Sequence, residues 1–96
     1  MTNLEIIGEC AFEVCQSLES IDLPSAKIVE QGAFEGCEAL RDVKFGKNLD
    51  WLGAETFHNC PSLERITIPL KNNLFVNDNV FANCQNLKRV DLVENA

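Results

Sequence analysis

The sequence predicts a repeat solenoid of the α/β class with about four coils, which together form one domain over residues 1–96. The first observation is a set of phenylalanines that recur after 22, 23 and 24 residues: Phe12, Phe34, Phe57 and Phe81. Two further columns follow them, each three residues on: Cys15, Cys37, Cys60 and Cys84, then Leu18, Leu40, Leu63 and Leu87. Self-similarity at one period of about 20 to 50 residues is typical of stacked repeats.

Each copy ends in a predicted β-strand. The four strand segments are LESIDL, LRDVKF, LERITI and LKRVDL. Apolar and polar residues alternate along them, which predicts one buried and one exposed face. The residues expected to point inward are Ile21, Val43, Ile66 and Val90, then Leu23, Phe45, Ile68 and Leu92. The period and the L-x-x-I-x-L strand pattern are those of a leucine-rich repeat.

The other part of each copy is predicted to turn. The copies are expected at about residues 4–25, 26–48, 49–72 and 73–96. The segments ECAFEVC, GAFEGC, ETFHNC and NVFANC are too short for stable isolated helices. We expect each to form one short helical or 3₁₀ turn on the convex side. A further inward column is expected five residues before each phenylalanine: Ile7, Val29, Leu52 and Val76.

Charge and composition exclude several kinds of partner. A net charge of −7 argues against nucleic acid and against anionic membrane surfaces. The first residues, MTNLEIIGEC, lack the basic region of a signal peptide, and no apolar run approaches the ~20 residues of a membrane span. A cytoplasmic location is therefore slightly favoured.

The segments Ala11–Pro24 and Thr56–Pro69 carry the pattern A-F-x-x-C-x-x-L-x-x-I-x-[IL]-P, with threonine replacing the alanine in the second. This pattern resembles the BspA-like leucine-rich repeats, over essentially all of the chain. The resemblance implies a right-handed solenoid with a parallel β-sheet on its concave side. It also implies a non-catalytic module for protein binding or structure, or else a fragment of a longer, adhesin-like surface array. It assigns no functional residues.

No catalytic, cofactor or metal site is predicted. His58 is the single histidine, and the sequence contains none of the motifs of common hydrolases, kinases or metalloproteases. The repeated cysteines should lie side by side at about 4.8 Å and point in parallel, which suits neither tetrahedral metal ligation nor a disulfide. We expect reduced, buried thiols, with Cys10 exposed. An enzyme-associated domain is the remaining alternative of another class.

The concave face is predicted to be polar and balanced in charge. Its outward columns carry five acids and five bases: Glu19, Asp22, Asp42, Glu64 and Asp91, with Arg41, Lys44, Arg65, Lys88 and Arg89. Two interpretations stay open. The charges either fix strand register on a solvated face or form a polar binding surface for a protein partner. The face lacks an aromatic residue that could act as a binding hot spot.

A second candidate surface is a column of apolar residues: Ile6, Ile28, Trp51 and Phe75. Each residue comes immediately before an expected inward residue, so in extended backbone it should point outward. The column then forms either an exposed interaction strip or part of a second core layer. A third candidate is the two ends of the array. No polar capping copy covers them, so self-association through the ends is expected.

Overall fold

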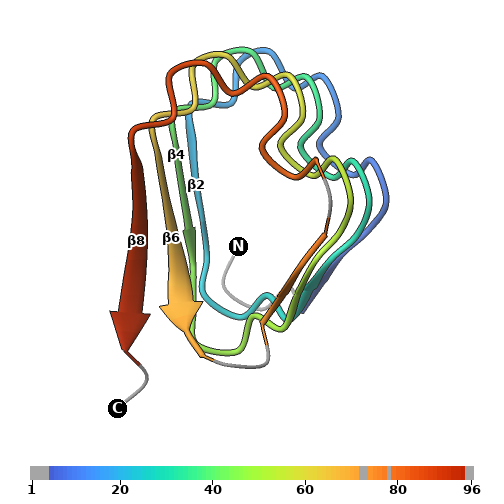
Figure 1. Ribbon diagram of the computed structural model, residues 1–96. Helices are drawn as coiled ribbons and strands as arrows, with labels where there is room; N and C mark the ends of the chain where they lie inside the picture. Colours follow the sequence, from blue (N-terminus) through green and yellow to red (C-terminus); the bar gives the residue numbers. More distant parts are fainter. Residues whose placement is uncertain (1–4, 72–73, 78, 95–96) are drawn as a thin grey trace.

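The computed structural model describes residues 5–71, 74–77 and 79–94 and forms a solenoid of four stacked coils (Figure 1). The main sheet is parallel, in the order β2-β4-β6-β8. Its strands are Ser20–Leu23 (β2), Asp42–Phe45 (β4), Arg65–Leu70 (β6) and Arg89–Glu94 (β8). The predicted strands and their register are confirmed, because Val43 pairs with Ile21 on one side and Ile66 on the other.

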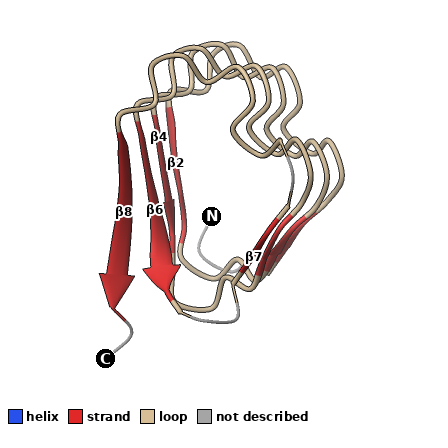
Figure 2. Cartoon of the chain, viewed as in Figure 1, coloured by secondary structure: helices blue, strands red, loops and turns tan. Residues whose placement is uncertain are grey.

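A second parallel sheet of two-residue strands lies across the interior from the main sheet (Figure 2). Its strands, in the order β1-β3-β5-β7, are Ile6–Ile7 (β1), Ile28–Val29 (β3), Trp51–Leu52 (β5) and Phe75–Val76 (β7). The first residues predicted for copies one and four, at 4 and 73, lie outside the described residues.

The described residues contain no helix, so the α/β class and the short helical or 3₁₀ turns are corrected to a β-solenoid with turns. Hydrogen bonds between coils give the reason. In the second coil the N–H groups of Gly32, Phe34 and Gly36 donate to carbonyls of the third coil at 2.9–3.0 Å. The residues between them donate within the turn, as Glu35 does to Gly32. A helix needs each of these N–H groups for its own ladder.

Left-handed backbone also interrupts each turn segment. Gly32 and Gly36 have φ of 68° and 74°, and the corresponding residues of the other coils share this conformation: Cys10, Glu55 and Asn79, then Val14, Asn59 and Asn83. One such residue every four positions is incompatible with right-handed helix, whose φ is near −63°. The turn segments are therefore successive tight turns.

The core lies between the two sheets and the turns. Phe34 and Phe57 are fully buried at its centre, and the four repeated phenylalanines stack with ring centroids 5.1, 5.4 and 5.9 Å apart. The inward columns are confirmed as buried in the second and third coils. In the fourth coil, however, Val76, Val90 and Leu92 were expected to be inward and are exposed, because a neighbouring coil covers this coil on one side only.

Candidate functional site

The column of Ile6, Ile28, Trp51 and Phe75, here called the apolar strip, begins the four strands of the second sheet. Its members are paired in register from coil to coil and are 59%, 37%, 40% and 49% exposed. The next residues of the first three coils, Ile7, Val29 and Leu52, are buried. The alternation of a strand therefore turns one column into the core and the strip toward solvent.

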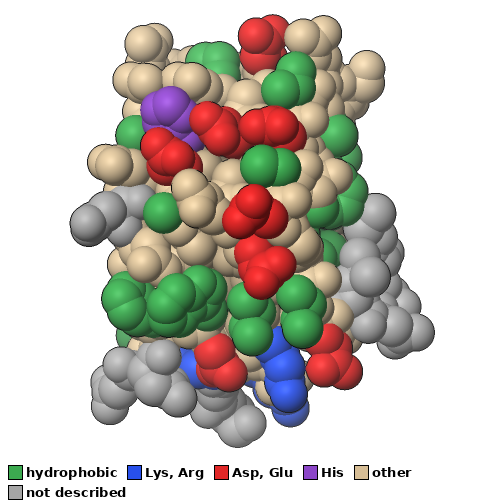
Figure 3. All heavy atoms as spheres, turned by 90° about the vertical axis from the view of Figure 1, so that its right-hand side faces the viewer, with side chains coloured by type: hydrophobic (Ala, Val, Ile, Leu, Met, Phe, Trp, Pro, Cys, Tyr) green, Lys and Arg blue, Asp and Glu red, His purple; other side chains and the backbone are tan. Residues whose placement is uncertain are grey.

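The two aromatic members of the strip contact each other. The ring centroids of Trp51 and Phe75 lie 4.7 Å apart with their planes tilted by 51°. In the space-filling view, hydrophobic side chains form a band across the lower part of this face, with acidic side chains above it (Figure 3). Asp50 immediately precedes Trp51 of the strip, and its Oδ1 lies 2.6 Å from Lys71 Nζ.

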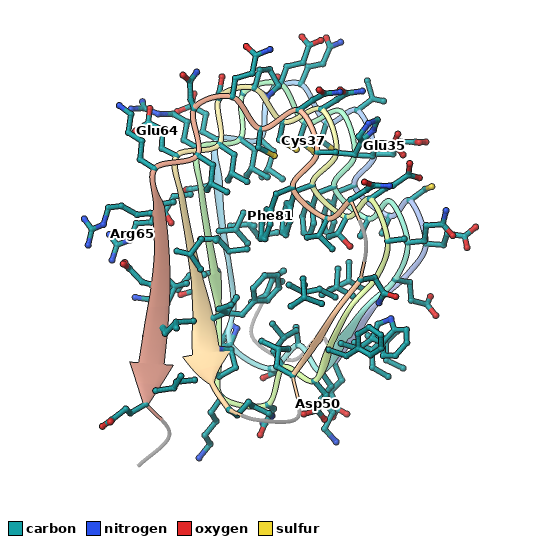
Figure 4. The ribbon with its side chains drawn as sticks, in the orientation of Figure 1. Glu35, Cys37, Asp50, Glu64, Arg65 and Phe81 are labelled. Atoms are coloured by element: carbon teal, nitrogen blue, oxygen red, sulfur yellow. The ribbon has the colours of Figure 1, made fainter. Side chains whose placement is uncertain are left out.

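The predicted charges of the concave face lie on the outer surface of the main sheet, where several of them pair with each other. Arg41 lies 3.6 Å from Glu64, in the neighbouring coil. Asp91 accepts from Arg65 Nε at 2.7 Å and lies 3.4 Å from Arg89. Glu64 and Arg65 point away from the interior, whereas Phe81 and Cys37 point into it (Figure 4).

A shallow depression also lies on this surface of the main sheet. It is lined by Glu19, Ser20, Arg41, Asp42, Glu64 and Arg65. Five of the ten charges form no ion pair with another described residue: Glu19, Asp22, Asp42, Lys44 and Lys88. The other five charges form exposed pairs, each of which stabilises by about 0.2–1 kcal/mol.

The cysteine column does not converge on a site. The thiols of the second, third and fourth coils each donate to the main-chain oxygen of a phenylalanine in the preceding coil: Cys37 to Phe12 at 3.0 Å, Cys60 to Phe34 at 3.2 Å and Cys84 to Phe57 at 3.0 Å. All five cysteines are free. Burial raises the pKa of Cys37 and Cys84, and raises that of Cys60 to about 12, so the thiols stay protonated. Among the described residues no group of His, Cys, Asp and Glu could hold a metal ion.

Two polar contacts between coils escape sequence analysis. His58 Nδ1 lies 3.1 Å from Glu35 Oε2, and Asn83 donates to the side-chain oxygen of Asn59 at 2.9 Å. In the repeat alignment the two members of each pair occupy the same column in adjacent coils, and this is the signal that could have found them. Both contacts join neighbouring turns.

The comparisons with known proteins agree with this architecture. A family model described as a BspA type leucine rich repeat region (6 copies) matches residues 1–96. The chain belongs to the BspA-type leucine-rich-repeat family. The resemblance seen in the phenylalanine–cysteine pattern is thereby confirmed. No curated protein matches the chain.

Two solved structures resemble this BspA-type chain in fold. One is a leucine rich cell surface protein from Faecalibacterium prausnitzii, with a TM-score of 0.66 and 20% identity over 96% of the chain and 31% of that protein. The other is the T. pallidum leucine rich repeat protein, with a TM-score of 0.51 and 20% identity over 95% of the chain and 66% of that protein. The chain thus spans less than two thirds of either structure.

These comparisons bear on two further expectations. The family match is to a repeat region, and neither solved structure is described as an enzyme. The cytoplasmic location gains no support, since one of the structures is that of a cell surface protein. Within the described part of the chain, no helix could cross a membrane.

Proposed function

We propose that this repeat region is a non-catalytic protein-interaction module that binds its partner through the apolar strip. The observation that carries the proposal is the exposure of four apolar side chains in one continuous column, two of them large aromatics in mutual contact. Contiguous exposed apolar surface often marks an interaction site. Trp and Tyr, with Arg, dominate binding energy at protein interfaces, and Phe is also enriched there.

The main sheet is the weaker candidate for this role. Arg41, Glu64, Arg65 and Asp91 already have partners within the chain. A ligand that competed for them would have to replace existing pairs. The net charge of −7 disfavours nucleic acid on either face, so a protein is the partner class that fits.

Trp51 provides the experiment because it is the single tryptophan. Its emission should be red-shifted and open to a soluble quencher, and partner binding should shift the emission to the blue. Trp51→Ala should weaken capture of the partner at least tenfold while lowering stability by only about 1 kcal/mol. Leu70→Ala is a matched control, because Leu70 is an exposed apolar residue at the end of β6, outside the strip.

Two outcomes would contradict the proposal. A blue-shifted, protected Trp51 whose removal unfolds the chain would make the strip part of the core. Binding that survives Trp51→Ala but is lost in Arg41→Ala would move the partner to the main sheet.

A second function, coil-to-coil association, is favoured by the surface at β8. Val90 and Leu92 are 46% and 56% exposed there, and the outer edge of β8 has no strand partner among the described residues. Such an edge can pair with another strand, either in a second copy or in a further coil of a longer array. We expect concentration-dependent association by light scattering, and its loss when a polar capping coil is added after residue 96. A monomer at high concentration would contradict this.

A further inference from the structure

The half of the coils that carries the apolar strip is strongly acidic. Between the start of each coil and the end of its turns lie seven described carboxylates: Glu5, Glu9, Glu13, Glu30, Glu35, Asp50 and Glu55. By the same bounds this half carries one lysine, Lys27, while Lys47 and Lys71 lie just before the third and fourth coils begin. The outward columns of the main sheet, by contrast, carry five acids and five bases, and Glu94 ends β8. The negative charge of the chain is therefore concentrated in the half of the coils that carries the strip. Figure 3 shows acidic side chains above the apolar band on this face.

Most of these carboxylates lack a counter-charge within the described chain. Asp50 pairs with Lys71, and Glu35 Oε2 lies within hydrogen-bond distance of His58 Nδ1, at 3.1 Å. The other five, Glu5, Glu9, Glu13, Glu30 and Glu55, form no ion pair with a described residue. Four of these five are exposed and Glu55 is half-buried. The outward columns of the main sheet carry as many bases as acids, whereas this half of the coils has an excess of acids, and its negative potential is open to a partner.

Two of these acids lie directly beside the strip. Glu5 immediately precedes Ile6 in its coil, and Glu30 lies two residues after Ile28. The position equivalent to Glu5 in the second coil holds a cation, Lys27. Strands of neighbouring coils are about 4.8 Å apart, so the four strip positions extend over about 14 Å. A ligand that covers the strip must therefore bury apolar groups and at the same time meet carboxylates along the edges.

From this arrangement we infer that the apolar strip binds a cationic amphipathic polypeptide segment, in which apolar side chains alternate with lysine or arginine. The inference rests on the proposed binding role of the strip and adds the chemical class of the partner. The apolar side chains would pack on Trp51 and Phe75, and the cations would face Glu5 and Glu30. The same field repels acidic polypeptides, nucleic acids and anionic lipid surfaces.

Three synthetic ten-residue peptides test the inference on the intact chain: one alternating leucine and lysine, one leucine and glutamate, and one serine and lysine. Binding is measured from the emission of Trp51. We expect the leucine–lysine peptide to bind at least tenfold more tightly than either of the others. Its binding should weaken about fivefold as salt rises from about 0.05 to 0.5 M, because exposed charges are then screened.

A charge-matched pair of double variants separates local from global electrostatics. Glu5→Gln with Glu30→Gln should lower the affinity for the leucine–lysine peptide about fivefold, because two exposed charge contacts of modest strength are lost. Glu38→Gln with Glu94→Gln removes the same charge outside the strip half of the coils and should change the affinity less than twofold. Equal effects of the two pairs would overturn the inference.

The remaining outcomes distinguish the inference from the proposed function. Equal binding of the leucine–glutamate peptide, or no binding of the leucine–lysine peptide at about millimolar concentration, overturns the cationic partner. In that case, loss of partner capture in Trp51→Ala would still support the strip as the binding site. Equal binding of the serine–lysine peptide would show that charge alone drives association, and would overturn both.

Discussion

The thiol of Cys60 donates to the main-chain oxygen of Phe34, one coil away, with 3.2 Å between Sγ and O. The same oxygen accepts the N–H of Cys37 from its own turn at 3.3 Å. One carbonyl thus receives a donor from each of two coils. The cysteine column fills space in the core and also bonds each coil to the one before it.

Cys60→Ala should lower the free energy of unfolding by about 1–2 kcal/mol. The variant loses a buried hydrogen bond and leaves a small cavity, and the two losses add. Chemical denaturation measures the change, with Cys10→Ala as the control, because Cys10 is exposed. Equal stability of the two variants would show that the thiol bond contributes nothing.

Alkaline pH should destabilise the chain through the same cysteine. Burial raises the pKa of Cys60 from 9.0 to about 12. Between these values the unfolded state loses the thiol proton while the folded state keeps it, so stability falls as pH rises. The slope is at most about 1.4 kcal/mol per pH unit for one thiol. The difference between the urea midpoints at pH 8 and pH 10 should be smaller in Cys60→Ala than in the parent chain. An equal difference in the two chains would contradict a raised pKa of Cys60.

Phe34→Ala should cost about 3–5 kcal/mol, as truncation of a buried aromatic side chain typically does. Phe34 is fully buried and stacks on Phe12 and Phe57. Phe12→Ala removes the same side chain at a half-buried position and should cost less. Thermal unfolding compares the two variants, and a midpoint that barely moves in Phe34→Ala would place this side chain outside the core.

Val14→Asn should stabilise the chain by about 1 kcal/mol. Val14 has φ of 57°, in the left-handed region, where a β-branched residue is strained. The corresponding residues of the other coils are Gly36, Asn59 and Asn83, which adopt this conformation more easily. Val14 is exposed, so the substitution removes little buried surface. Unfolding in urea is the measurement, and a destabilised variant would mean that Val14 makes a packing contact worth more than the strain.

Gly53→Ala should destabilise the chain by about 1–3 kcal/mol or more through overpacking. A Cβ at Gly53 would lie 2.6 Å from the main-chain nitrogen of Gln31 in the second coil. Gly8 occupies the same position in the first coil, and its nearest contact would be 4.0 Å, to the side chain of Glu30. Gly8→Ala is therefore expected to be nearly neutral by the same denaturation assay. Equal costs would contradict an origin in contact between coils.

The repeat by itself determined the architecture of this protein. Four columns that include Phe34 and Cys37 recur at a nearly constant period, and side chains at equivalent positions must stack when each coil packs on the last. The alternation within the strands also set the register, since a slip of one residue would turn Val43 out of the core. For the same reason, the outward position of the apolar strip could be expected from the residues that follow it.

The tertiary structure alone decided how the turns are built and which surface stays open. The turns are not helical because Gly32, Phe34 and Gly36 give their N–H groups to the next coil, and no local propensity encodes a bond to a residue more than 20 positions away. Long-range packing also decided whether a second layer of the core covers Trp51. No such layer covers it, and Trp51 is exposed. Likewise, Arg65 pairs with Asp91, whereas Glu30 forms no ion pair with a described residue. Both outcomes follow from distances that exist only once the coils are stacked.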